Sequence, residues 1–260
     1  MKKSDIKVLV ITGFGLNCER ETAAACKLVG AAPEQVHLND LIAGRHKLEE
    51  YQFLVFIGGF SFGDHLGSGT VFANRVKFRL HDQLEKFVAD GKLVMGICNG
   101  FQALVKSGLL PYGRLGMVTK ESPTLFRNDV NRHISQIVST RVATTASPWL
   151  RGFRPGELHS IAVSHGEGKF VVSEELAREL FANGQVAFQY ADAAGNPTAE
   201  APWNPNGSSY AIEGIISQNG LILGKMGHTE RYENNLFKNI AGNKQQSLFA
   251  NAVAYFRKVQ

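Results

Sequence analysis

The sequence has no apolar run long enough to span a membrane. A transmembrane helix needs about 18 or more consecutive apolar residues, and no apolar segment of these 260 residues approaches that length. The opening "MKKSDIKVLVITGFG" places two lysines before an apolar run, as a secretory signal does. Asp5 and Lys7 interrupt that run, and Gly13 and Gly15 break it. We therefore expect a cytoplasmic protein without a membrane partner, and we interpret residues 7 to 12 as its first strand.

Cysteine is scarce, and its spacing excludes the usual metal and disulfide frameworks. The sequence has three cysteines, Cys18, Cys26 and Cys98, an odd number at spacings that match no zinc or disulfide pattern. This usage is typical of a reducing compartment, and it predicts at least one free thiol and no metal site. We interpret Cys18 and Cys26 as buried and inert, which is the commoner fate of this residue type.

Clusters of positive charge and nucleotide-binding loops are also missing. The net charge is +5, but the lysines and arginines are scattered and no basic run interleaves with aromatic residues. This distribution argues against a nucleic-acid partner. There is no G-x-x-x-x-G-K-[ST] loop, and "GFGLNC" lacks the last glycine of a dinucleotide fingerprint. We therefore expect no nucleotide or other cofactor in this chain.

Short apolar runs alternate with segments of helical periodicity along the first part of the chain. The runs "KVLVIT", "QVHL", "FLVFI" and "KLVMGI" predict buried strands, whereas residues 18–29, with Asn17 as N-cap, residues 71–90 and "NGFQALVKSG" predict helices. The alternation predicts an α/β fold with three layers, in which helices cover both faces of a mostly parallel sheet. Residues 109–172 predict an antiparallel insertion. We expect residues 1–260 to form a single domain.

A cysteine between two glycines follows the last of these predicted strands. The segment Gly96-Ile97-Cys98-Asn99-Gly100 is the cysteine form of the G-x-S-x-G nucleophile elbow, in which small neighbours permit a tight turn that points the nucleophile outward. Ligands of an open parallel sheet bind beyond the carboxyl ends of its strands. A helix N-terminus at this position stabilises a thiolate. The pattern therefore favours Cys98 as a nucleophile.

A thiolate that attacks a carbonyl also needs donors for the oxyanion and an acid for the leaving group. The turn "FIGGFSFGD" brings the backbone N–H of Gly59 or Phe60 to the same sheet edge, where either could act together with the Asn99 N–H. For the acid we favour His228, which follows an apolar strand and has Glu230 two residues on to orient it. His165, in a polar glycine-rich loop, is the rival.

Six motifs together resemble the class I (triad) glutamine amidotransferases, and within them the glutaminase components of phosphoribosylformylglycinamidine synthases. The similarity extends over nearly the whole chain and rests on "GLNCERET", "GGFSFGDHLGSG", "GICNGFQ", "LFRND", "SHGEGKF" and "GHTER", in that order. It implies that Cys98 is the nucleophile, His228 the general base and acid, and Glu230 its orienting partner. It also implies ammonia release from glutamine to a synthetase partner that uses ATP and Mg²⁺ in purine biosynthesis.

The resemblance also suggests contacts for the substrate glutamine. Gln102 lies one turn past the nucleophile on the predicted helix, and the loop from Ser164 to Gly168, with His165 and Gly166, is a second candidate. The alternative without a function is a solvated helix residue for Gln102 and a surface turn for the loop.

The sequence departs from the family in two places. The usual pattern around the histidine is M-P-H-P-E-R, but here Gly227 and Thr229 replace the prolines. We therefore expect a histidine loop that becomes fixed only when a partner packs against it. The tail "ENNLFKNIAGNKQQSLF" is more similar to the end of the single-chain synthases, which leaves open whether the chain acts beside a separate partner or as the equivalent of a fused domain.

Three other functions are compatible with the same residues. The first is an amidotransferase for another acceptor, because the triad chemistry is common to all of them. The second is a cysteine-elbow peptidase or chaperone of related fold, which would not need the H-x-E pair. The third is a catalytically degenerate regulatory or interaction module, against which the intact Cys98, His228 and Glu230 argue.

Overall fold

A nine-stranded mixed sheet forms the centre of the molecule in the computed structural model, which describes residues 6–258. Its strand order is β2-β1-β3-β4-β11-β10-β9-β6-β7, and β5 and β8 form a separate two-stranded sheet. The strands are β1 (Lys7–Thr12), β2 (Ala32–His37), β3 (Phe53–Phe56), β4 (Leu93–Ile97), β5 (Thr124–Phe126), β6 (Ile134–Val142), β7 (Leu158–His165), β8 (Lys169–Val171), β9 (Val186–Tyr190), β10 (Ile212–Ile216) and β11 (Ile222–Lys225).

One half of the large sheet is parallel and the other is antiparallel. Strands β2, β1, β3, β4 and β11 run parallel to one another. Strand β10 is antiparallel to β11, and β10, β9, β6 and β7 pair with one another in antiparallel fashion. Every residue of β3 and β4 is buried, as expected for strands covered on both faces. The predicted α/β architecture with an antiparallel portion is confirmed, although the antiparallel part extends past residue 172 to β10.

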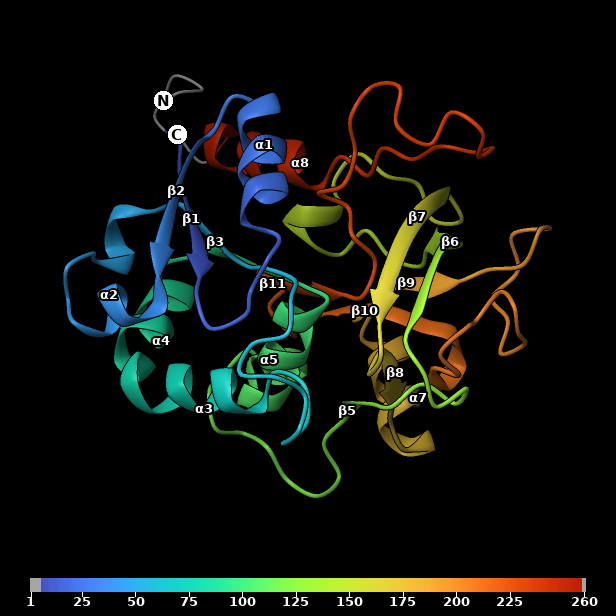
Figure 1. Cartoon of the computed structure of the whole chain (residues 1–260), viewed down its shortest axis with the longest axis horizontal. Coiled ribbons are helices and arrows are strands. Elements are labelled where there is room, and N and C mark those ends of the chain that lie inside the picture. Colours follow the sequence, from blue (N-terminus) through green and yellow to red (C-terminus); the bar gives the residue numbers. More distant parts are fainter. Residues whose placement is uncertain (1–5, 259–260) are drawn as a thin grey trace.

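Helices cover both faces of the parallel half. In Figure 1, α1 and α8 lie together on one side of the sheet, and α3, α4 and α5 lie on the other. Among the described residues, no helix has both the length and the apolar character that crossing a bilayer requires. The helices are α1 (Glu19–Leu28), α2 (Leu38–Ile42), α3 (Thr70–Arg79), α4 (His81–Ala89), α5 (Asn99–Ser107), α6 (Leu109–Tyr112), α7 (Glu174–Ala182) and α8 (Leu248–Lys258).

Two local predictions about helices are wrong. The segment predicted as one helix over 71–90 is two, because Leu80 has non-helical dihedral angles (φ −126°, ψ 14°) and buries its side chain at the break between α3 and α4. The residue before α1 is Cys18, not Asn17, and it makes no side-chain capping hydrogen bond. Its thiol instead donates to Oδ1 of Asn17 at 3.4 Å.

Candidate active site

Cys98 lies between β4 and α5, at the carboxyl edge of the parallel half of the sheet. Its backbone has φ 52° and ψ −107°, a region that a non-glycine residue occupies only under strain and that is common at functional sites. The two flanking glycines permit the turn. A Cβ on Gly100 would lie 1.9 Å from the Phe56 carbonyl oxygen, and a Cβ on Gly96 would lie 2.8 Å from the Gly100 carbonyl oxygen. The structure therefore has the elbow geometry that the motif predicts.

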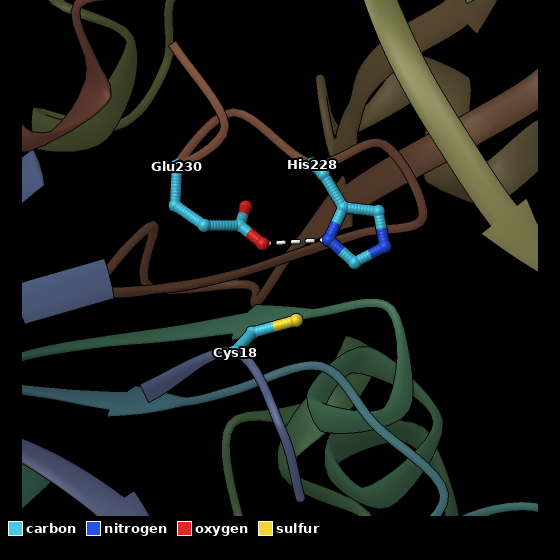
Figure 2. A group of neighbouring side chains, drawn as sticks. All are labelled: Cys18, His228 and Glu230. Carbon is cyan, nitrogen blue, oxygen red and sulfur yellow. Dashed lines mark hydrogen bonds and ion pairs between the residues drawn. The ribbon is translucent and has the colours of Figure 1, made fainter. Parts of the chain in front are cut away.

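His228 and Glu230 follow β11, the strand next to β4 in the sheet. Figure 2 shows the imidazole and the carboxylate facing each other, and Nδ1 of His228 lies 2.6 Å from Oε1 of Glu230. Both side chains are buried. Burial lowers the pKa of His228, but the Glu230 charge and the neighbouring Cys18 and Cys98 sulfurs outweigh it, so the net pKa is well above the usual value. Burial raises the pKa of Glu230, and the imidazole outweighs it and lowers that pKa.

Gly58, just after β3, marks the point where these groups meet. A Cβ at this position would lie 2.9 Å from Cε1 of His228, 3.0 Å from Sγ of Cys18 and 3.6 Å from Cβ of Cys98. The absence of a side chain at residue 58 thus leaves a space that the imidazole of His228 and the side chains of Cys18 and Cys98 all border. Nε2 of His228 is buried and makes no hydrogen bond to a nitrogen or oxygen of the described residues. That nitrogen is available for proton exchange with a substrate.

The three candidate oxyanion donors differ in availability. The Phe60 N–H donates to the Gly15 carbonyl oxygen at 2.9 Å, so the prediction for Phe60 does not hold in this conformation. Gly59 lies in close contact with the segment before α1, where a Cβ would come within 2.6 Å of the Leu16 Cα. The Asn99 N–H begins α5, where backbone donors lack a partner within the helix. Gly59 and Asn99 remain the candidate donors.

Gln102 and the loop over residues 164–168 are joined to each other and to the elbow. Nε2 of Gln102 donates to the Glu167 carbonyl oxygen at 2.7 Å, and its Oε1 accepts from Nδ2 of Asn99 at 2.9 Å. The Cys98 thiol points at the Ser164 carbonyl oxygen, 3.6 Å away. Gln102 is buried, so in this conformation it orders the loop, and contact with substrate stays a prediction.

His165 is buried below this loop. Its Nδ1 lies 3.2 Å from Oδ1 of Asn128, which also accepts from the Gly168 N–H at 2.9 Å. Burial, and after it the charges of His228 and His133, lower the pKa of His165 to about 3. A neutral imidazole held in this way supports the loop, and the structure places His228, not His165, beside a carboxylate.

A polar cavity of about 380 Å³ opens next to the loop. Gly166 lines it, and the hydroxyl of neighbouring Ser164 lies 3.0 Å from Nε2 of His133, another lining residue. The cavity carries charges of both signs, which suits a zwitterionic amino acid. Its charged or titratable lining residues are Asp64, His65, Arg127, Arg132, His133 and Glu167.

Cys18 is a residue whose place the sequence reasoning missed. It is buried, as expected, but its thiol points toward the His228–Glu230 pair (Figure 2), and Nη2 of Arg231 donates to its Sγ at 3.4 Å. The expectation that Cys18 is buried is confirmed, and its inertness stays a prediction. Cys26 is buried as well, and burial raises the pKa of that thiol far above its usual value, which is consistent with an inert residue. The available signal was the position of Cys18 after the first parallel strand, at the same sheet edge as Cys98.

The sulfur, imidazole and carboxylate of Cys18, His228 and Glu230 offer ligand atoms within 4.8 Å of one another. Such groups can bind zinc. However, the carboxylate already accepts from the imidazole, and the guanidinium of Arg231 contacts the sulfur, which disfavours a second cation there. We retain the prediction that the site holds no metal.

The chain belongs to the family of CobB/CobQ-like glutamine amidotransferase domains, which its residues 5–256 match. Within that class, several similar proteins carry the same name. It is 40% identical over 272 residues to the phosphoribosylformylglycinamidine synthase subunit PurQ of Methanococcus maripaludis, with 97% of this chain and 98% of the relative covered. Identity to the PurQ subunit of Archaeoglobus fulgidus is 36% over 243 residues, covering 89% of each chain.

Solved structures agree with this assignment. A chain of the PurLQS structure from Thermotoga maritima superposes with a TM-score of 0.74 and 28% identity, covering 97% of this chain and 99% of that one. The glutaminase domain of Trypanosoma brucei CTPS, solved with bound acivicin, has a TM-score of 0.56 at 10% identity and covers 97% and 94%. The second likeness shows the fold alone, whereas the first, with the PurQ relatives, confirms the resemblance that the motifs indicated.

Proposed function

We propose that this chain is the glutaminase component of a phosphoribosylformylglycinamidine synthase and that Cys98, His228 and Glu230 are its catalytic triad. One observation carries the assignment of the triad. A buried imidazole paired with a carboxylate 2.6 Å away follows β11, and the strained cysteine elbow follows β4, its parallel neighbour. The position of these groups at one sheet edge, after adjacent parallel strands, supports their proposed roles as nucleophile, base and orienting acid.

The first half of the reaction forms a thioester. The Cys98 thiolate attacks the side-chain carbonyl carbon of glutamine, and the Gly59 and Asn99 N–H groups stabilise the oxyanion. The protonated His228 gives its proton to the departing nitrogen, so that ammonia leaves and the γ-glutamyl thioester remains. Glu230 holds Nδ1 and stabilises the imidazolium, which agrees with the raised pKa of His228.

The second half returns the enzyme to its starting state. His228, now neutral, takes a proton from a water molecule that attacks the thioester, and the Cys98 thiolate leaves as glutamate forms. The polar cavity beside the 164–168 loop is the proposed glutamine site, with Glu167 facing the α-ammonium and Arg127 or Arg132 facing the α-carboxylate. The products are glutamate and ammonia, and ammonia is the one that a synthetase consumes.

The acceptor chemistry belongs to a partner. A synthetase subunit would use the ammonia, with ATP and Mg²⁺, to convert formylglycinamide ribonucleotide to its amidine, and this chain would carry no cofactor. We place the reaction in the cytoplasm. The three cysteines are free thiols in the structure, which is consistent with a reducing compartment.

Glutamate release by the purified chain, with and without the synthetase and its nucleotides, tests this function. The isolated chain should hydrolyse glutamine slowly and accelerate when the synthetase binds formylglycinamide ribonucleotide and ATP. Because the His228–Glu230 pair is already formed within this chain, we expect the gain mainly in KM. A full rate unchanged by any partner would indicate an independent hydrolase, and stimulation by a different acceptor enzyme would indicate an amidotransferase of another pathway.

A further inference from the structure

A buried ion pair lies directly behind the catalytic histidine. Glu213 in β10 and Lys225 in β11 are completely buried, and their Oε1 and Nζ atoms are 3.3 Å apart. The two strands are antiparallel neighbours in which Gly214 faces Lys225. Burying two charges is costly, and apolar residues of similar volume often serve stability equally well. The pair therefore calls for an explanation other than general stability.

Both members of the pair bind the backbone of the same residue. The Gly227 N–H donates to Oε1 of Glu213 at 2.5 Å, and Nζ of Lys225 donates to the Gly227 carbonyl oxygen at 2.8 Å. The 227–228 peptide, whose carbonyl oxygen Lys225 binds, is also held at its other end, since the His228 N–H donates to the Ala162 carbonyl oxygen at 2.8 Å. Three hydrogen bonds from groups of this chain thus fix the backbone immediately before His228.

The ion pair also explains why residue 227 is a glycine. A Cβ there would lie 2.8 Å from Oε1 of Glu213, 2.9 Å from Nζ of Lys225 and 2.8 Å from Cγ2 of Ile161. Glycine is the most flexible residue, whereas a proline, found here in the usual family pattern, fixes its own φ. The expectation of a loose histidine loop is therefore corrected, because the charged pair restrains the glycine.

We propose that Glu213 and Lys225 are positioning residues for His228, in place of the proline that precedes the histidine in the usual family pattern. The proposal rests on the triad function proposed above. Neither residue touches the reacting atoms. They act by holding the Gly227 peptide, which sets where the imidazole lies relative to Cys98 and Glu230.

The main test is the double variant E213M/K225M. Removing one member alone would leave an unpaired buried charge and strongly destabilise the fold, whereas the double variant is neutral and close in shape. We expect kcat for glutamine hydrolysis to fall about tenfold or more, since a small misplacement of a catalytic group is costly, while KM changes by less than about twofold.

A second readout separates positioning from general stability. The rate of Cys98 alkylation by chloroacetamide, followed against pH by mass spectrometry, reports the interaction of the thiol with His228 without requiring turnover. His228→Ala defines the profile without the imidazole, and the double variant should move toward it. Phe87→Leu, at a buried position of α4, is the matched control, which should lower the melting temperature but keep kcat and the profile.

The outcomes distinguish the two proposals. If His228→Ala changes neither turnover nor alkylation, the triad function fails. If His228→Ala changes both but the folded double variant matches wild type, only the positioning role is overturned. Should the double variant not fold, hydrogen exchange of the Gly227 amide in the wild-type chain decides instead. Slow exchange is expected for a clamped peptide, and exchange as fast as in exposed loops would overturn the proposal.

Discussion

Replacing Gly58 with alanine should disable the active site without unfolding the protein. The new methyl group would lie 2.9 Å from Cε1 of His228 and 3.0 Å from Sγ of Cys18, whereas comfortable carbon contacts are about 3.5–4.0 Å. The imidazole would have to move by roughly half an ångström or more, away from the position in which Nδ1 lies 2.6 Å from Glu230.

The size of the effect follows from this displacement. Misplacing a catalytic group by about 1 Å can reduce the rate about 100-fold, so we expect kcat of Gly58→Ala to fall between about tenfold and 100-fold. Overpacking of a buried site should cost about 1–3 kcal/mol of unfolding free energy. Glutamate release and urea denaturation measure the two effects separately.

Gly44→Ala is the control for this experiment. Gly44 has φ +71°, and a Cβ there would meet no atom within 4 Å, so the substitution should cost about 1 kcal/mol of backbone strain and leave kcat unchanged. Wild-type kcat in a folded Gly58→Ala variant would refute the reasoning, because it would mean that the imidazole does not work from the position beside Gly58.

Three further predictions concern charge, packing and metal. In the wild type, the raised pKa of His228 contributes stability that is full below the unfolded value of about 6.5 and is lost as the pH rises through the raised pKa. In Glu230→Gln, burial dominates and lowers that pKa, so the stability that His228 contributes should instead grow as the pH rises. Urea denaturation at several pH values measures this, and a dependence of the unfolding free energy on pH with the wild-type slope would contradict it. Gly100→Ala should lose more than about 3 kcal/mol or fail to fold, because its Cβ would lie 1.9 Å from the Phe56 oxygen; a normal melting curve would be incompatible with the elbow packing. Dialysis against EDTA should leave the glutaminase rate of the isolated chain unchanged, since Arg231 and His228 already pair with the sulfur and the carboxylate, and a loss restored by zinc would reveal a metal centre.

The sequence predicts those parts of the fold that depend on local patterns. Apolar runs such as residues 53–56 and 93–97 form strands whose residues are buried on both faces of the sheet. The elbow glycines mark the turn at Cys98. The break at Leu80 was not predictable, because a helical pattern of apolar residues continues through it and the split depends on how α3 and α4 pack. The length of the antiparallel half was also missed, because β9 and β10 are buried runs whose direction is set by their partners.

In the candidate site, too, local patterns could be predicted and tertiary contacts could not. Cys98, His228 and Glu230 could be proposed from local spacing, since each motif has residue types that suit one chemical role. The contacts of Cys18 with Arg231 and of Phe60 with Gly15 were not predicted, because the sequence alone does not place these residues near each other. A local signal did exist for the Glu213–Lys225 pair: each strand, "AIEGI" and "LILGKM", carries one charge of opposite sign among apolar residues.

Trapping of the nucleophile tests the central claim most directly. The chain is treated with a chloroketone analogue of glutamine, digested and analysed by mass spectrometry. We expect one adduct, on the peptide that contains Cys98, with excess glutamine preventing it. Cys98→Ala should form no adduct and release no glutamate, yet melt cooperatively like the wild type. An adduct on Cys18 or Cys26 with Cys98 untouched, or glutamine hydrolysis by Cys98→Ala at the wild-type rate, would contradict the account.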